Sequence, residues 1–180
     1  MRIATIALIW SLLVSSCSEI TFPVAQPAGE KALTELPPTL TGRYLAHDQD
    51  GEDTDTLIIE PSGYHFMDKN GKDFLNRGVI SDTLVIKYYQ GYYFVNFRSE
   101  NQWVLRIVRQ KPSGSIEFLG IDIQDEEVRK AVLKRLKKDF RISSTRKKDI
   151  SYYMINPSPQ QLMQLLKGGF FTGGELDKVR

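Results

Sequence analysis

The sequence is poor in the residues that most often form cross-links or catalytic centres. Its 180 residues include one cysteine, Cys17, and two histidines, His47 and His65. One cysteine cannot form a disulfide within the chain. The glycine patterns of nucleotide-binding loops and the Gly-x-Ser-x-Gly pattern of hydrolases are absent. The sequence therefore contains no motif for nucleotide binding or for serine-hydrolase chemistry.

Neither sign of charge dominates the chain. The 24 Lys and Arg residues and the 22 Asp and Glu residues give a formal net charge of +2. Such a balance does not favour any class of partner by overall charge. Hydrophobic residues make up 41% of the chain, which is enough for one core.

The chain has one long apolar run, from Ile3 to Val14, which follows the basic residue Arg2. This run is too short to span a bilayer, and small residues follow it. The pattern predicts a cleaved export signal over residues 1–16.

The end of this run, Val14-Ser15-Ser16-Cys17, resembles the lipobox of bacterial lipoproteins. The resemblance implies cleavage before Cys17 and acylation of that cysteine, which holds the protein in a lipid bilayer. An acylated cysteine is not available for thiol catalysis. Ser18, in place of the Asp that retains such proteins in the inner membrane, favours the outer membrane. A periplasmic and a surface-facing domain both stay open, as does an ordinary signal peptide with an incidental cysteine.

The segment after the lipobox has several prolines and no sustained hydrophobic period. Residues 17–38 include Pro23, Pro27, Pro37 and Pro38. We expect this segment to be the lipidated N-terminus followed by a flexible tether. Residues 39–180 are then a single β-rich domain.

From Thr41 onward, short runs of β-branched and aromatic residues alternate with turn pairs such as Asn70-Gly71 and Gln90-Gly91. This texture predicts a mainly β fold, an antiparallel meander of about eight strands that is open or barrel-like. The expected strands are 42–47, 56–60, 64–68, 72–76, 83–89, 92–98, 103–109 and 115–121.

The turns also predict how neighbouring strands face each other. A two-residue turn at Gln90-Gly91 sets Tyr88 opposite Tyr93, with Ile86 and Leu84 following on the same face. For the next hairpin we favour a three-residue loop, 100–102, over a two-residue turn, because the latter would set Arg106 opposite Val95. The loop 111–114 then places Phe118 beside Ile107.

Two helices are predicted after the strands. Asp125 caps a helix near 126–138, whose apolar stripe is Val128, Ala131, Val132 and Leu136. A strand at 150–155 and a second helix at 159–167 follow. Ser158 caps the second helix, Pro159 begins it and Gly168 ends it.

The first helix and the loop after it carry the strongest local charge asymmetry in the chain. These positions form either a solvated surface or a surface for an anionic partner, which could be an envelope protein, an anionic lipid or a glycan. Export away from the chromosome leaves no expected nucleic-acid partner. The candidate residues are Arg129, Lys130, Lys134, Arg135, Lys137, Lys138, Lys147 and Lys148.

Four tyrosines surround the turn at Gln90-Gly91. The register puts Tyr88 and Tyr93 on the core face. Tyr89 and Tyr92 are then the exposed pair, a possible aromatic patch for a sugar or a protein partner.

No residue set predicts a cofactor or a metal site. The acidic stretch 47–55 departs from a calcium-binding loop at its glycine and at its twelfth position. We therefore expect a membrane-tethered, non-enzymatic interaction or accessory module.

Two alternatives stay open. Gly42-Arg43-Tyr44 resembles the first strand of lipocalins, which implies a carrier of a lipid or other apolar ligand. An envelope hydrolase is the third candidate, and it requires His47 or His65 beside a carboxylate in a cleft.

Overall fold

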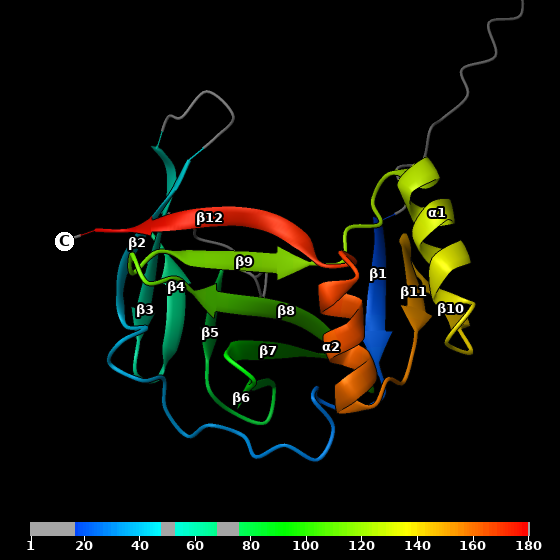
Figure 1. Ribbon diagram of the computed structural model, residues 1–180, viewed down its shortest axis with the longest axis horizontal. Helices are drawn as coiled ribbons and strands as arrows, with labels where there is room; N and C mark the ends of the chain where they lie inside the picture. Colours follow the sequence, from blue (N-terminus) through cyan, green and yellow to red (C-terminus); the bar gives the residue numbers. More distant parts are fainter. Residues whose placement is uncertain (1–16, 48–52, 68–75, 180) are drawn as a thin grey trace, which may run out of the picture.

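The computed structural model describes residues 17–47, 53–67 and 76–179. Within these ranges the chain forms twelve strands and two helices, so the prediction of a mainly β fold with two helices is confirmed (Figure 1). The strands are β1 (Cys17–Phe22), β2 (Gly42–His47), β3 (Asp53–Glu60), β4 (Gly63–Phe66), β5 (Arg77–Val79), β6 (Leu84–Tyr89), β7 (Tyr92–Ser99), β8 (Gln102–Gln110), β9 (Ile116–Gly120), β10 (Ser143–Lys147), β11 (Ile150–Met154) and β12 (Thr172–Lys178), and the helices are α1 (Glu126–Leu136) and α2 (Pro159–Lys167).

The strands form one mixed sheet that does not close. Its path is β10-β11-β1-β8-β9-β12-β2-β3-β4-β5, while β7 also pairs with β8 and β6 pairs with β7. Eight strands in a purely antiparallel meander were predicted, and both points are corrected here. The chain adds β1, β5, β10 and β12 to the predicted strands, and β1 runs parallel to β11. Positions 72–75 of the predicted strand 72–76 lie outside the described residues.

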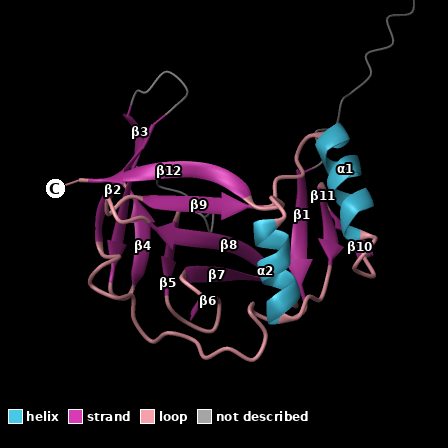
Figure 2. Cartoon of the chain, viewed as in Figure 1, coloured by secondary structure: helices cyan, strands magenta, loops and turns pink. Residues whose placement is uncertain are grey.

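Apolar side chains cover both faces of the central strands. Along β8, Val104 and Val108 lie in one cluster, whereas Leu105 and Ile107 lie in another. The first cluster, here called the inner core, lies within the curve of the sheet. The second, the helix-side core, contains residues of both helices, which lie toward the same end of the molecule (Figure 2).

The N-terminal segment belongs to the fold, so the prediction of a flexible tether beginning at Cys17 is wrong. Cys17 to Thr21 pair with Ile150 to Met154, and Phe22 pairs with Trp103. Ile20 and Phe22 are buried in the helix-side core. Only two alternating apolar residues, Ile20 and Phe22, stand before Pro23, and this period is too short to predict a strand.

Residues 23–41, called the strap below, cross from β1 to β2 along the lower side of the sheet (Figure 1). Buried Asn96 accepts a hydrogen bond from the Gln26 amide (2.6 Å) and donates one to the Gln26 carbonyl (2.8 Å). The Lys87 ammonium donates to the carbonyls of Ala25 (2.7 Å) and Pro27 (2.9 Å). These bonds satisfy strap backbone groups that the sheet removes from water.

Both helices begin where the sequence predicts. The Asp125 carboxylate accepts hydrogen bonds from the amides of Glu127 and Val128, and α1 ends at Leu136, two positions before the predicted end. Leu136 is buried, but Val128 is 46% exposed, so the predicted stripe packs at one end only. The second helix, α2, has the predicted bounds, and its cap Ser158 forms a capping box with Gln161.

Candidate functional site: an apolar cavity in the curved sheet

The inner core is not completely filled. It leaves a partly open cavity of about 250 Å³ between the sheet and the strap. Asp55 is the one charged residue in the lining, and nearly all other lining groups are aliphatic or aromatic. The lining residues are Leu36, Leu40, Ala46, Asp55, Leu57, Ile59, Tyr64, Phe66, Ile86, Tyr93, Val95, Phe97, Val108, Ile116, Phe118 and Leu176.

The period of the strands places these side chains. Alternate residues of a strand share a face, and the lining takes every second residue of β3, β4, β7 and β9. On β7 these are Tyr93, Val95 and Phe97, which were predicted to lie on the core face. The hairpin register that supports this prediction is confirmed, because Tyr88 faces Tyr93 and Ile86 faces Val95.

The strap covers part of the cavity. Leu36 and Leu40 line it, and the Thr39 carbonyl between them accepts hydrogen bonds from Gln110 and from Lys178 (2.9 Å). The Tyr44 hydroxyl donates to the Leu40 carbonyl (2.8 Å). Burial raises the pKa of the Tyr44 phenol, so Tyr44 keeps the proton that it donates.

This cavity can hold an apolar group but offers little chemistry. A void with so few polar groups gives water few hydrogen bonds, whereas apolar surface transferred into it gains about 25 cal/mol per Å². Its volume lies just below the range of about 300–1,000 Å³ that is typical of small-molecule sites. The arrangement suits a short alkyl chain or a small ring.

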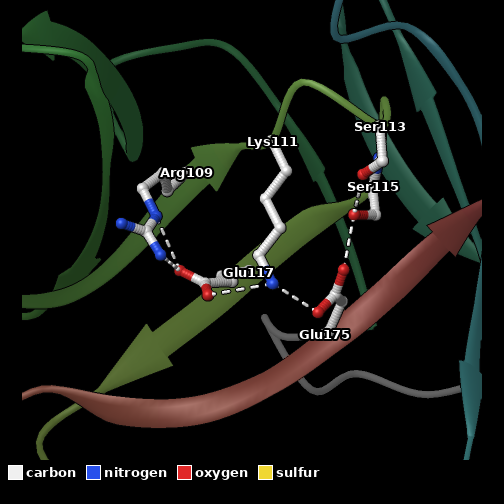
Figure 3. A network of polar contacts seen from close by, with 6 residues as sticks. All are labelled: Arg109, Lys111, Ser113, Ser115, Glu117 and Glu175. Carbon is white, nitrogen blue, oxygen red and sulfur yellow. Dashed lines mark hydrogen bonds and ion pairs between the residues drawn. The ribbon is translucent and has the colours of Figure 1, made fainter.

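A second feature is the network of polar side chains where β8, β9 and β12 meet (Figure 3). Glu117 accepts hydrogen bonds from the Arg109 guanidinium, and Lys111 lies 3.2 Å from the same carboxylate. Lys111 also pairs with Glu175, which accepts a hydrogen bond from the Ser115 hydroxyl. The network therefore joins the β8–β9 hairpin to β12, a strand that is distant from it in sequence.

The charges of this network argue against a serine–lysine catalytic pair. The hydrogen bond to Glu175 raises the pKa of Lys111, and Glu117 adds to the effect. A general base must be neutral to accept a proton, so Lys111 is held in the wrong form to activate Ser115. We interpret the network as a set of contacts that stabilise the pairing of β12 with β9.

The structure divides the predicted basic surface into two groups. Arg129 donates to the carbonyls of Ile123 and Gln124 and to the Ser18 hydroxyl. Lys130 pairs with Glu126 and Glu127, Arg135 binds the Gly168 carbonyl and stacks on Phe170, and Lys147 pairs with Glu100. The other four basic residues are exposed and make no ion pair within the described ranges: Lys134, Lys137, Lys138 and Lys148.

The prediction that Tyr89 and Tyr92 are the exposed pair at this turn is wrong. Tyr89 and Tyr92 are partly buried against the helix-side core, whereas Tyr88, predicted to be in the core, is 51% exposed and lies against Tyr93. The prediction assumed that one face of this hairpin is exposed to solvent. The helix-side core covers that face, which register alone could not reveal.

The remaining candidates form no second site. His65 lies 3.9 Å from Glu60 on the surface, and neither residue lines the cavity. Cys17 is exposed at the first position of β1, and the rest of the lipobox lies outside the described residues, as do positions 48–52 of the acidic stretch.

The described residues contain neither a candidate metal site nor a candidate membrane-spanning helix. No group of three or more acidic, histidine or cysteine side chains in these ranges could hold a metal ion. No helix in the same ranges has the length and apolar character needed to cross a membrane.

Comparison of the chain with protein-family models, with curated proteins and with solved structures gave no match. The cavity, its strap and the surface charges are therefore the basis for a functional proposal.

Proposed function

We propose that this protein is a cell-envelope lipoprotein that binds a small apolar ligand in the cavity of its curved sheet. It is anchored in a membrane, for which the outer membrane is the proposed location, through acylated Cys17. The function is non-enzymatic and needs no cofactor. The carrier was the alternative to an interaction module in the sequence analysis, and the cavity is the observation that now favours it.

The composition of the cavity lining supports binding rather than simple imperfect packing. Sixteen residues from eight strands and the strap line one partly open space of about 250 Å³. Well-packed interiors contain few voids larger than a water molecule. An apolar void also costs stability, by about 24 cal/mol for each Å³ in a series of truncated cores. A ligand that fills the space recovers part of this free energy.

The proposed anchor fits the position of Cys17 in the fold. It is exposed, and it begins β1 without an intervening linker. An acyl chain on this residue would hold the domain directly at the bilayer surface. The cavity, in the inner core, would then lie on the other side of the sheet from the helix-side core that contains Ile20 and Phe22.

Native mass spectrometry tests the proposal directly. The chain from Ser18 onward, carrying an affinity tag, is recovered gently from its own cell envelope. We expect a stoichiometric adduct of low mass that an organic solvent removes. A bare monomer, combined with no binding of short-chain fatty acids or of an apolar fluorescent dye by the emptied protein, would refute it.

A cavity-filling variant locates the ligand. Ala46→Phe places a ring in the cavity, and Ala131→Phe places the same ring on the exposed surface of α1 as a matched control. We expect Ala46→Phe to weaken binding at least about tenfold while it keeps or raises the melting temperature, because it fills an existing void. Equal binding by both variants would mean that the ligand binds elsewhere.

The interaction module is the second candidate, supported by the exposed lysines that lack ion pairs. Charge reversal at Lys134, Lys137 and Lys148 should weaken a contact with an anionic partner and reduce its salt dependence. Vesicles with and without anionic lipid provide the measurement. Identical behaviour of the wild type on both kinds of vesicle would remove an anionic lipid as the partner.

A further inference from the structure

Of the two strands that end the path of the sheet in the described ranges, β10 is the longer. The path of the sheet ends at β5 and β10, and β6 pairs with β7 alone. The outer side of β6 is covered by the strap, since the Leu33 amide donates to the Ile86 carbonyl (2.7 Å) and Ala32 forms a bridge with Lys87. β5 has only three residues, whereas β10 has five.

β10 has the properties of a strand that can accept another. All five of its residues are exposed, and its pairing with β11 runs without a bulge from Ser143 to Lys147. It contains neither proline nor glycine. Within the described ranges no backbone group of another segment pairs with its outer side. Such an edge presents free amide and carbonyl groups that can be extended by a further strand.

The charge of this edge selects the partner. Arg146 and Lys147 lie on β10, Lys148 follows in the turn, and Arg141 precedes the strand. A parallel, in-register second copy of β10 would set Arg146 and Lys147 against the same residues of that copy, which disfavours this pairing. An antiparallel copy centred on Thr145 would set both basic residues opposite serines and would form no ion pair. Lys147 already binds a carboxylate, that of Glu100, across the surface. An incoming strand with acidic side chains would gain both backbone hydrogen bonds and ion pairs.

We propose that β10 is a docking edge for an extended acidic segment of a partner protein, which adds to the sheet as a further strand. This is recognition by strand addition, in which backbone hydrogen bonds give affinity and side chains give specificity. The proposal does not depend on the cavity. It differs from the second candidate function above, because it requires an extended chain and not merely a negative surface.

The test uses a synthetic peptide of alternating Glu and Val with a fluorescent label. Its control replaces each Val by Pro, which keeps the charge but prevents pairing at an edge. Binding is followed by anisotropy at increasing salt concentrations, and hydrogen exchange reports the protection of residues 143–147. We expect the first peptide to bind, to lose affinity as salt rises and to protect β10, whereas the proline peptide does not bind.

Two charge reversals of equal size separate an edge from a diffuse surface. Arg146→Glu with Lys148→Glu changes the β10 edge, and Lys134→Glu with Lys137→Glu changes α1 by the same net charge. We expect the first pair to weaken binding about tenfold and the second to change it less than about twofold. Circular dichroism checks that both variants are folded.

Several outcomes would overturn the proposal. Equal loss of affinity in the two variants, or equal binding of the two peptides, would identify a diffuse basic surface instead of an edge. No binding of either peptide would also refute it. A dimer of the unmodified protein in analytical ultracentrifugation, abolished by the β10 reversals, would show that the edge pairs with a second copy.

Discussion

Replacing Asn96 by leucine should remove hydrogen bonds that hold the strap on the sheet and should lower the free energy of unfolding. Asn96 is fully buried. Leucine has the same number of side-chain heavy atoms, so the change removes hydrogen bonds with little change in volume. The Gln26 amide loses its acceptor at 2.6 Å, and the Gln26 carbonyl loses a donor at 2.8 Å.

The expected magnitude follows from these two orphaned groups. Each buried polar group left without a partner costs about 1–3 kcal/mol, and burial of the leucine offsets part of the sum. We expect the free energy of unfolding to fall by about 3 kcal/mol, which lowers the melting temperature by roughly 6–12 °C. Chemical denaturation followed by tryptophan fluorescence gives the first value and calorimetry the second.

Gln110→Ala is the control, because it removes a strap hydrogen bond without leaving an orphaned group. The Thr39 carbonyl keeps the hydrogen bond from Lys178 when Gln110 is shortened. We expect a loss below about 1 kcal/mol for this variant. If Asn96→Leu costs no more than Gln110→Ala, or if hydrogen exchange in the strap is unchanged, the strap is not held in the way described.

Three further predictions concern the rest of the fold. The hydrogen bond from Lys111 lowers the pKa of Glu175, so the ionised carboxylate of Glu175 stabilises the fold at neutral pH and loses this effect as pH falls through the lowered pKa. The difference in free energy of unfolding between wild type and Glu175→Gln should therefore vanish in acid. A difference that is independent of pH would contradict this. Ser158→Ala should cost about 1 kcal/mol in denaturant titrations through loss of the α2 cap, and a Ser158→Asp variant should retain most of that stability. Gly173→Ala should strongly destabilise the β9–β12 pairing, because an added Cβ would lie 1.9 Å from the Phe118 carbonyl oxygen; an unchanged melting temperature would refute this packing.

Local signals in the sequence predicted local structure well. The β6–β7 register is as predicted because Gln90 (φ 47°) and Gly91 (φ 87°) both adopt the left-handed region that a two-residue hairpin turn requires. Similarly, α2 has the predicted bounds because Ser158, Pro159 and Gly168 carry its start and stop signals. These features depend on residues close to one another in the chain.

Signals that depend on distant residues were misread. The next hairpin uses the two-residue turn that we rejected, so Arg106 does face Val95, and Val108 rather than Ile107 faces Phe118. Arg106 is acceptable there because Glu19, on β1, pairs with it at 2.8 Å. Matching apolar residues across a hairpin cannot anticipate a carboxylate supplied by the far N-terminus.

The sequence could not predict the cavity or the exposed β10 edge, for the same reason. The alternation along β7 correctly indicates that Tyr93, Val95 and Phe97 point inward. It does not say how far the sheet curves, and that curvature decides whether the inner face is filled or hollow. The sequence also shows no pattern for β10, since its five residues are exposed on both faces and have no apolar period.

The parallel pairing of β1 with β11 has a consequence for the order of folding. Cys17 faces Ile150, so the first strand of the domain has its longest partner near the end of the chain. Loop closure over such a distance is slow, and during synthesis the partner emerges long after β1. We therefore expect β1 to be among the last strands to join the sheet. If Cys17 is acylated as proposed, this delay gives the modifying enzyme a period in which β1 is not yet paired with β11.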